Sequence, residues 1–406
     1  MALHLKNNSE IGKQNKKQKK QKVEDKLQDK KHFSFYNSQF EIIDLFNGYE
    51  DLKNKIVKAV GNADDRFNED ALRMMRAIRL VCQLSKASKS QFSIYKRNPN
   101  FWTIEKNTLE AIKKNADNLK FISPERIRDE LNKIILSNYP AKGIELLQKT
   151  GLLSHIIPEL EKGIGVGQNR HHIYTIWKHS IMSLKFCPSK KLDVRLATLL
   201  HDIAKPQTKK GEGFYSTFYN HDRIGAKISE KILKRLHYPN AIINKVKLLV
   251  ENHMFYYNPE EVGESSVRKL IRKVGLENMK DLIDLRMAER LGSGVPKAKP
   301  YKLRHLEYMI DKVSHDAISV KMLKINGNDL MEELKIKPSP KIGAILDVLL
   351  AEIIEDASKN SKEFLLKRAR DLNKEDLKKL RQMAKLKIEE KKEEEDREIR
   401  NKHWIK

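Results

Sequence analysis

The amino-acid sequence predicts an all-α protein that consists of several helical parts, with one residual strand near the N-terminus. Three observations lead to this fold class. Apolar residues recur at helical spacing along most of the chain after Asp64, prolines separate the periodic stretches, and only one short segment has the character of a strand. No repeat of fixed period is present.

Residues 1–31 are basic and low in complexity, which predicts a disordered leader. The segment FEIIDLF at 40–46, followed by the turn pair Asn47-Gly48, is the strand candidate of the N-terminal third. From Asp64 or Asp65 onward, apolar residues at i, i+3, i+4, i+7 and i+11 predict a helix that runs to Cys82.

Ser123-Pro124 predicts the start of another helix, because serine caps helices and proline fits their first position. The segment from about Lys374 is rich in Lys and Glu, so that a solvated helix and a frayed tail are both compatible with it. Further helices are predicted at 143–150, 173–187, 191–204, 224–236, 240–252, 266–274 and 277–291.

The chain carries a large excess of basic residues. Its 406 residues include 81 Lys and Arg against 55 Asp and Glu, which gives a formal net charge of +26. Phosphates attract Lys and Arg regardless of base sequence, so this charge favours a nucleic-acid partner. A general basic bias of a Lys-rich proteome would give the same excess, and charge alone leaves both explanations open.

Cys82 and Cys187 lie far apart and outside any metal-ligand spacing, so we expect two free, buried thiols in a reducing compartment. No apolar stretch follows the basic N-terminus, and no apolar run approaches the ~20 residues of a membrane span. We therefore expect a cytoplasmic protein with no membrane partner.

A series of histidines and acidic residues occurs in helical context. His201-Asp202 ends an apolar helix, where adjacent side chains lie ~100° apart and can reach one ion beside the helix. Imidazole with carboxylate suits a divalent ion that polarises phosphate and activates water, and neutral imidazole favours Mn²⁺, Ni²⁺, Co²⁺ or Fe²⁺ over Mg²⁺. The other candidates by type and context are His179, His221, His253 and Glu289.

The ordered series over 170–295 resembles the HD superfamily of metal-dependent phosphohydrolases. The resemblance implies that His201 and Asp202 are catalytic. The last ligand of that family is ordinarily Asp, whereas this chain has Glu289 at the matching place, with Asp284 as an alternative. The metal ligands that the resemblance implies are His179, His201, Asp202, His221, His253 and Glu289, of which His221 and His253 hold a second ion or phosphate.

Arg66, Asp70 and Arg73 fall at i, i+4 and i+7 of the predicted helix and hence on one face. A carboxylate accepts from the exocyclic amine of cytosine or adenine, and a guanidinium donates to ring acceptors. Such a face could read the Watson–Crick edge of one nucleotide. A salt-bridged, solvated helix face would show the same pattern, and periodicity alone leaves both interpretations open.

The string IIDLFNGYEDLKNKIVKAVGNADDRFNEDALRMMRAIR is similar to the stretch that joins head and neck in bacterial tRNA nucleotidyltransferases, the CCA-adding enzymes and their poly(A) polymerase relatives. The similarity continues through SPERIRDELNKII, GLLSHIIPEL and INGNDLMEELKIKPSPKIGAILDVLL and covers about residues 42–370. The resemblance implies a helical neck and body, tRNA as partner, ATP and CTP as substrates, and Mg²⁺ for nucleotidyl transfer. It assigns nucleotide selection to EDALR at 69–73, with nucleotide-binding residues Arg66, Asp70, Arg73 and Arg76.

The catalytic head of that family needs a Gly-rich turn followed by Arg-Asp, and paired Asp residues that hold two Mg²⁺ ions. The 406 residues contain no Gly-Gly and no Asp-x-Asp. KKHFSFY at 30–36 resembles a degraded remnant of the head, and GIGVG at 163–167 lacks the Lys-Ser/Thr that a P-loop requires. We therefore expect most of the head to be missing.

Three functions fit this sequence. The first is an enzyme of tRNA 3′-end processing to which a separate polypeptide supplies the head. The second is a hydrolase that acts on RNA 2′- or 2′,3′-cyclic phosphates, and the third is a non-catalytic RNA-binding remnant. The expected division is a leader at 1–31, a head remnant at 32–60, neck and RNA-binding body at 61–160, an HD metal domain at 161–295, a helical tail domain at 296–371, and a charged C-terminal helix or tail at 372–406.

Overall fold

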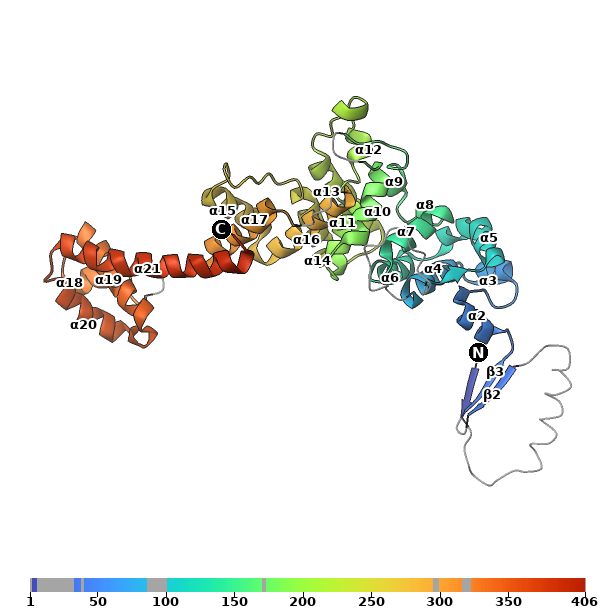
Figure 1. The fold of residues 1–406 in the computed structure, drawn as a ribbon, viewed down its shortest axis with the longest axis horizontal. Coiled ribbons are helices and arrows are strands. Elements are labelled where there is room, and N and C mark those ends of the chain that lie inside the picture. The colour runs from blue at the N-terminus through green and yellow to red at the C-terminus, as the bar shows by residue number, and fades with distance from the viewer. Residues whose placement is uncertain are drawn as a thin grey trace, which may run out of the picture. The chain divides into compact units, whose positions relative to one another are not determined.

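Helices make up most of the computed structural model, which confirms the all-α fold class (Figure 1). The structure describes residues 2–5, 33–37, 40–85, 101–169, 173–294, 299–315 and 323–405. The chain divides into two compact units, the first Met1–Met254 with Asp281–Ala298 and the second Phe255–Lys280 with Lys299–Lys406. The predicted body and most of the predicted metal domain therefore share one unit.

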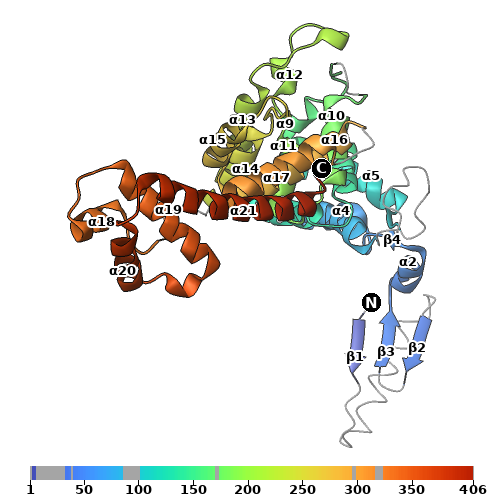
Figure 2. The ribbon, with the colours of Figure 1, turned by 60° about the vertical axis from the view of Figure 1, so that its left-hand side comes forward.

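The N-terminal strands are β1 (Ala2–Leu5), β2 (Phe33–Asn37) and β3 (Phe40–Asp44). They form an antiparallel sheet in the order β1-β3-β2, with Ala2 opposite Ile43 and Phe33 opposite Asp44 (Figure 2). The predicted strand at 40–46 is thus confirmed over Phe40–Asp44.

The prediction of disorder over 1–31 is wrong for Ala2–Leu5, which pairs with β3. Pairing to a strand about 40 residues away is a non-local contact that local composition does not reveal. Residues 6–32 lie outside the described part of the chain.

Asp44 ends β3 and organises the turn into helix α2 (Gly48–Asn54). Its buried carboxylate accepts hydrogen bonds from the amides of Phe46, Gly48 and Tyr49 at 3.3, 2.8 and 2.8 Å. The bond from Tyr49 contributes most to lowering the pKa of Asp44. This carboxylate is occupied by backbone amides and has a structural role.

The first unit contains a second small sheet, in which β4 (Ile56–Val57) and β5 (Thr103–Ile104) pair in parallel. Helix α4 packs against α6 and α7 in the body, while α11 and α13 both pack against α14. Its helices are α2, α3 (Ala63–Glu69), α4 (Leu72–Leu84), α5 (Lys106–Asn115), η1 (Ala116–Phe121), α6 (Pro124–Ile135), α7 (Pro140–Lys149), α8 (Leu153–Ile156), α9 (Pro158–Glu161), α10 (Ile176–Phe186), α11 (Leu192–Leu200), α12 (Lys205–Thr208), η2 (Gly213–Tyr215), α13 (His221–Arg235), α14 (Asn240–Asn252) and most of α16 (Leu276–Gly292).

The prediction of one continuous helix from Asp64 to Cys82 is wrong. Asn62 caps α3 by accepting a hydrogen bond from the Asp64 amide at 2.9 Å, and α3 ends at Glu69. Asp70 then has extended backbone angles, φ −151° and ψ 100°, before α4 begins. The helix predicted after Ser123-Pro124 is confirmed as α6, with proline in the first turn.

The second unit has its own apolar core, formed by side chains of α18 to α21 that include Leu330, Ile345 and Leu365. The C-terminal segment forms one of the two predicted alternatives, a helix, but that helix is not solvated throughout. Leu377, Leu380 and Ala384 of α21 join this core. The unit contains α15 (Glu264–Val274), the start of α16, α17 (Tyr301–His315), α18 (Gly327–Leu334), α19 (Pro340–Glu355), η4 (Ala357–Lys359), α20 (Lys362–Leu372) and α21 (Leu377–His403).

Cys82 and Cys187 are free and buried, as predicted. Within the described ranges, every helix is too short or too polar to cross a membrane.

Candidate metal centre and nucleotide pocket

Four elements of the first unit bring the predicted histidines and Asp202 together. His179 lies in the middle of α10, and His221 is the first residue of α13. The helix predicted at 191–204 is shorter in the structure. Helix α11 ends at Leu200, and His201 and Asp202 form the turn after it. His253 likewise follows the end of α14. All five side chains are buried.

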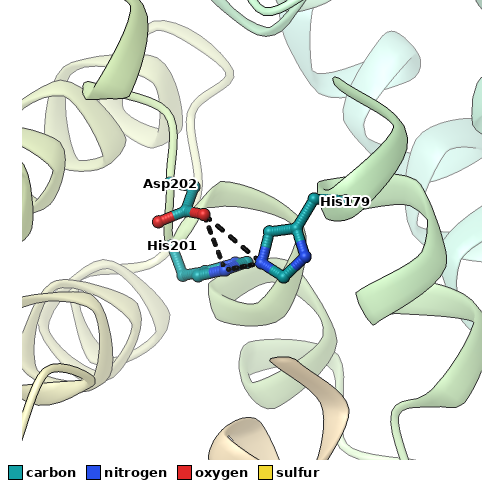
Figure 3. Close-up of side chains that lie close together, drawn as sticks. All are labelled: His179, His201 and Asp202. Carbon is teal, nitrogen blue, oxygen red and sulfur yellow. Dashed lines mark hydrogen bonds and ion pairs between the residues drawn. The ribbon is translucent and has the colours of Figure 1, made fainter. Parts of the chain in front are cut away.

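The first group of possible ligands consists of His179, His201 and Asp202. The Nε2 atoms of the two histidines are 3.1 Å apart, and each lies 3.3 Å from Asp202 Oδ2. Figure 3 shows His179 meeting the other two side chains from a separate helix. Three donor atoms at these separations can face one divalent ion.

The second group shares Asp202 and adds His221 and His253. Their Nε2 atoms lie 3.5 and 3.8 Å from Asp202 Oδ1. The two oxygens of Asp202 therefore face two different pairs of imidazoles, which is the arrangement of a carboxylate that serves two adjacent cation positions.

Backbone carbonyls orient three of these imidazoles. The Nδ1 atoms of His201, His221 and His253 each donate to the carbonyl three residues earlier, at 2.8, 2.6 and 2.6 Å. A carbonyl only accepts, so Nδ1 carries a proton, and in the neutral imidazole Nε2 then offers its lone pair. Histidines that bind metals are commonly held in this way.

The donor set fits a divalent metal. Asp202 Oδ1, His221 Nε2 and His253 Nε2 are buried polar atoms with no hydrogen-bond partner among the described residues. Burying such atoms is costly unless another group satisfies them, and a cation would do so.

Electrostatics keeps two of the imidazoles neutral. Burial lowers the pKa of His179 to about 3 and that of His253 to about 4. Burial opposes the charge on Asp202, but His201 and Lys205 outweigh it and hold the pKa of this carboxyl well below its usual range. Neutral imidazole and ionised carboxylate are the forms that bind metal.

Lys205 also belongs to this site, although the sequence did not lead us to predict it. Its ammonium lies 2.7 Å from Asp202 Oδ2 and also donates to Gln168 Oε1 at 2.8 Å. The side chain is buried. The i, i+3 spacing from Asp202 was a readable signal, because residues at that spacing face each other on a helical turn.

Glu289 is buried but belongs to neither group of ligand atoms. Its two oxygens accept from Arg286 Nη1 at 2.7 and 2.6 Å. Burial would raise the pKa of Glu289, yet Arg286, His253 and His201 lower it to about 2. The structure thus pairs the predicted last ligand with an arginine on its own helix.

The second site is a cavity of about 390 Å³ beside α3 and α4. Three of the four predicted nucleotide-binding residues, Arg66, Arg73 and Arg76, line it. Its other lining residues are Val57, Lys58, Ala59, Val60, Phe67, Ala77, Leu80 and Thr108. An apolar wall beside several cations suits a base with attached phosphates.

Glu69 holds two of these arginines, with Arg66 Nη1 at 2.9 Å and Arg73 Nη1 at 2.7 Å from its oxygens. Asp70 does not share their face, in contrast to the prediction. It caps α4 through the Leu72 amide at 3.1 Å and pairs with Arg126 Nη2 at 2.9 Å. The break between α3 and α4 turns it away.

Two segments of the chain match models of known protein families. Residues 102–164 match the family model described as the probable RNA and SrmB-binding site of polymerase A. Residues 212–369 match the model described as a putative tRNA nucleotidyltransferase domain 2.

Three bacterial relatives are similar over most of the chain. The A-adding tRNA nucleotidyltransferase of Deinococcus radiodurans is 29% identical over 324 residues, which cover 76% of this chain and 69% of the relative. The CC-adding tRNA nucleotidyltransferase of Thermus thermophilus is 28% identical, with 74% and 66% covered. The CCA-adding enzyme of Ligilactobacillus salivarius is 29% identical, with 82% and 67% covered. The chain spans about two thirds of the length of each.

Among solved structures, the CCA-adding enzyme of Bacillus stearothermophilus in complex with CTP matches 82% of this chain and 70% of its own, with 22% identity and a TM-score of 0.47. The family models and the curated relatives agree with the resemblance read from the sequence. The chain is thus similar over most of its length to bacterial tRNA nucleotidyltransferases, which are enzymes, and two of its segments match models of polymerase A and tRNA nucleotidyltransferase domains.

Proposed function

We propose that this chain supplies the tRNA-binding and nucleotide-selecting part of a tRNA nucleotidyltransferase, acting on the tRNA 3′ end with CTP or ATP as substrate. The cavity lined by Arg66, Arg73 and Arg76 carries the proposal. Guanidinium groups bind phosphate oxygens through paired donors, and Phe67 and Leu80 give an apolar wall for a base.

The ion pairs around the cavity support this role. Glu69 holds Arg66 and Arg73 in place in the absence of ligand, so that less side-chain freedom is lost when a nucleotide binds. In the proposal Asp70, which pairs with Arg126 in this structure, gives up that guanidinium and turns toward the cavity, where its carboxylate accepts from the exocyclic amine of the incoming base.

The carboxylate pair that holds two Mg²⁺ ions in nucleotidyl transfer comes, in this proposal, from a separate head polypeptide. The sequence contains no Asp-x-Asp, and Asp44, which lies near the cavity residues along the chain, is occupied by three backbone amides. The net charge of +26 supports binding of the tRNA backbone.

Equilibrium binding of CTP and ATP to the full chain tests the pocket. Arg73→Ala and Arg76→Ala should each weaken nucleotide binding about tenfold or more, as expected for loss of a charged hydrogen bond. Lys231→Ala, which removes an exposed cation on α13, is the matched control and should leave binding within twofold. Equal affinity in all four proteins would reject the pocket as the nucleotide site.

The histidine cluster favours a second function, hydrolysis of an RNA 2′- or 2′,3′-cyclic phosphate at a divalent metal. His179, His201, Asp202, His221 and His253 would hold the metal, which when bound supplies a Lewis acid and an acidic water. The chain's own contribution is to keep Nε2 lone pairs facing the centre and to offer Lys205 to a phosphate oxygen.

Metal content tests this second function. Protein loaded with Mn²⁺ and dialysed should retain metal by elemental analysis, while His201→Ala should lose it. His155→Ala is the matched control, because this histidine pairs with Asp117 outside the cluster. Hydrolysis of a 2′,3′-cyclic nucleotide should follow the metal content. Wild-type protein that retains no more metal than His201→Ala would show the cluster to be structural.

A further inference from the structure

A short loop next to the histidine cluster exposes several aromatic side chains. Lys210 and Thr217 form an isolated antiparallel bridge that closes it, with backbone hydrogen bonds of 3.0 and 2.9 Å. Phe214 is 57% exposed and Tyr215 80% exposed at the tip, and Tyr219 just after the loop is 73% exposed. Large aromatic side chains in water are costly, so a cluster of them marks a binding surface.

Hydrogen bonds and two glycines hold the loop in a defined conformation. Ser216 is buried, its hydroxyl donates to the Gly213 carbonyl at 2.8 Å, and its own carbonyl accepts from Asn169 Nδ2 at 2.8 Å. Gly211 and Gly213 have φ of +75° and +61°, which only glycine adopts readily. These contacts fix the loop while leaving its aromatic tip outside.

The base of the loop is tied to the histidine cluster. The Phe218 carbonyl accepts from Nδ1 of His221, and the Lys205 ammonium lies 5.5 Å from the centre of the Phe218 ring. Lys205 in turn pairs with Asp202. Phe214 at the tip is thus four residues from Phe218, whose backbone carbonyl orients a candidate metal ligand.

We propose that Phe214, Tyr215 and Tyr219 form a stacking platform for unpaired RNA nucleotides that lead to the histidine cluster, an inference that rests on the proposed phosphohydrolase function. Aromatic faces stack on any base, which gives binding without sequence preference. Lys209, Lys210 and Arg223 flank the platform for phosphate contacts, against the two acidic residues Glu212 and Asp222.

The composition of the loop favours RNA over a lipid surface or an apolar protein partner. The tip reads Gly-Glu-Gly-Phe-Tyr-Ser-Thr, with rings and hydroxyls but no aliphatic side chain. The Phe214 and Tyr215 rings stand edge to face, 5.1 Å between centres, so one ring can present its face to a base.

Binding to single-stranded and duplex RNA tests the platform. The full-length protein in EDTA is titrated with an eight-nucleotide single strand and with a blunt duplex of the same length. The double variant Phe214→Ala/Tyr215→Ala should bind the single strand about tenfold more weakly and the duplex within twofold of wild type. Phe214→Tyr/Tyr215→Phe, which keeps both rings, should restore single-strand binding. Tyr256→Ala removes an equally exposed ring, 69%, in the second unit and should have no effect.

Unchanged single-strand binding in the double alanine variant, or equal weakening for strand and duplex, overturns the platform. Hydrolysis of a 2′,3′-cyclic mononucleotide by the same variant separates this result from the fate of the metal site. A mononucleotide does not need the platform, so its rate should stay within twofold of wild type. If the wild-type protein binds single strands through these rings but hydrolyses no cyclic nucleotide, the proposed hydrolase function is wrong and the stacking platform still holds.

Discussion

At the residue scale, Arg286 and Glu289 form an ion pair in which the carboxylate is buried and the guanidinium is partly exposed. Arg286→Ala in metal-free protein should destabilise the fold by about 3–5 kcal/mol, because it leaves the Glu289 carboxylate buried without its partner. The double variant Arg286→Ala/Glu289→Gln should recover much of that loss, since no charge is left buried. Urea unfolding at pH 7 measures all three free energies.

The loss caused by Arg286→Ala should also shrink as pH falls. In wild type the pKa of Glu289 is lowered to about 2, so its contribution is present above the unfolded pKa near 4.5 and fades below it. Without Arg286, burial raises that pKa and the carboxylate takes up a proton on acidification. Lys234→Ala, at an exposed pair on α13, is the control and should cost less than about 1 kcal/mol at either pH. An Arg286→Ala effect as small as this control's would contradict the account.

Residue types and their order along the chain were enough to predict which histidines gather around Asp202. The pairing of Glu289 with Arg286 also had a local signal at i−3, but the resemblance to metal-dependent phosphohydrolases assigned Glu289 as a ligand instead. The pairing of Asp70, in contrast, could not be predicted from the sequence. Its partner Arg126 is 56 residues away, and only the three-dimensional fold brings the two together.

At the element scale, the position of α16 against α10 depends on Gly292. A Cβ at this position would lie 2.1 Å from Ser183 Oγ and 2.7 Å from the Ser183 amide, so the backbones would have to separate. Gly292→Ala should destabilise the protein by about 1–3 kcal/mol, as overpacking does. Thermal or urea unfolding measures this loss.

Gly343→Ala is the matched control, because a Cβ on this residue of α19 meets no described atom within 4 Å. It should stabilise the protein by about 0.5–1 kcal/mol, since alanine favours the helix over glycine. If Gly292→Ala stabilised the protein as well, the close packing of α16 on α10 would be refuted.

Most helices could be predicted from periodicity, since α6, α10, α13 and α14 have long apolar stripes. The predictions of secondary structure failed where contacts with residues far away in the sequence, rather than local residue patterns, determine the backbone conformation. The apolar periodicity from Ala71 to Cys82 belongs to α4 and its N-cap alone, so it carried no information about the break at Asp70 that separates α4 from α3. The pairing of Ala2–Leu5 with β3 has no local signal.

At the scale of the whole molecule, the chain combines a cavity lined by three arginines and a histidine cluster within its first unit. In the proposed function the cavity selects the nucleotide, and the histidine cluster would carry out a separate hydrolysis. We propose that this chain chooses the nucleotide while a separate polypeptide supplies the metal-binding carboxylates.

Incorporation of labelled CMP and AMP into tRNA tests that claim most directly, using the purified chain alone and together with a nucleotidyltransferase head polypeptide. The account predicts no incorporation by the chain alone and incorporation when the head is added. It also predicts that Asp70→Ala and Arg73→Ala change the ratio of CMP to AMP by about tenfold or more while tRNA binding stays within about twofold. Incorporation by the chain alone, or an unchanged nucleotide ratio in both variants, would contradict it.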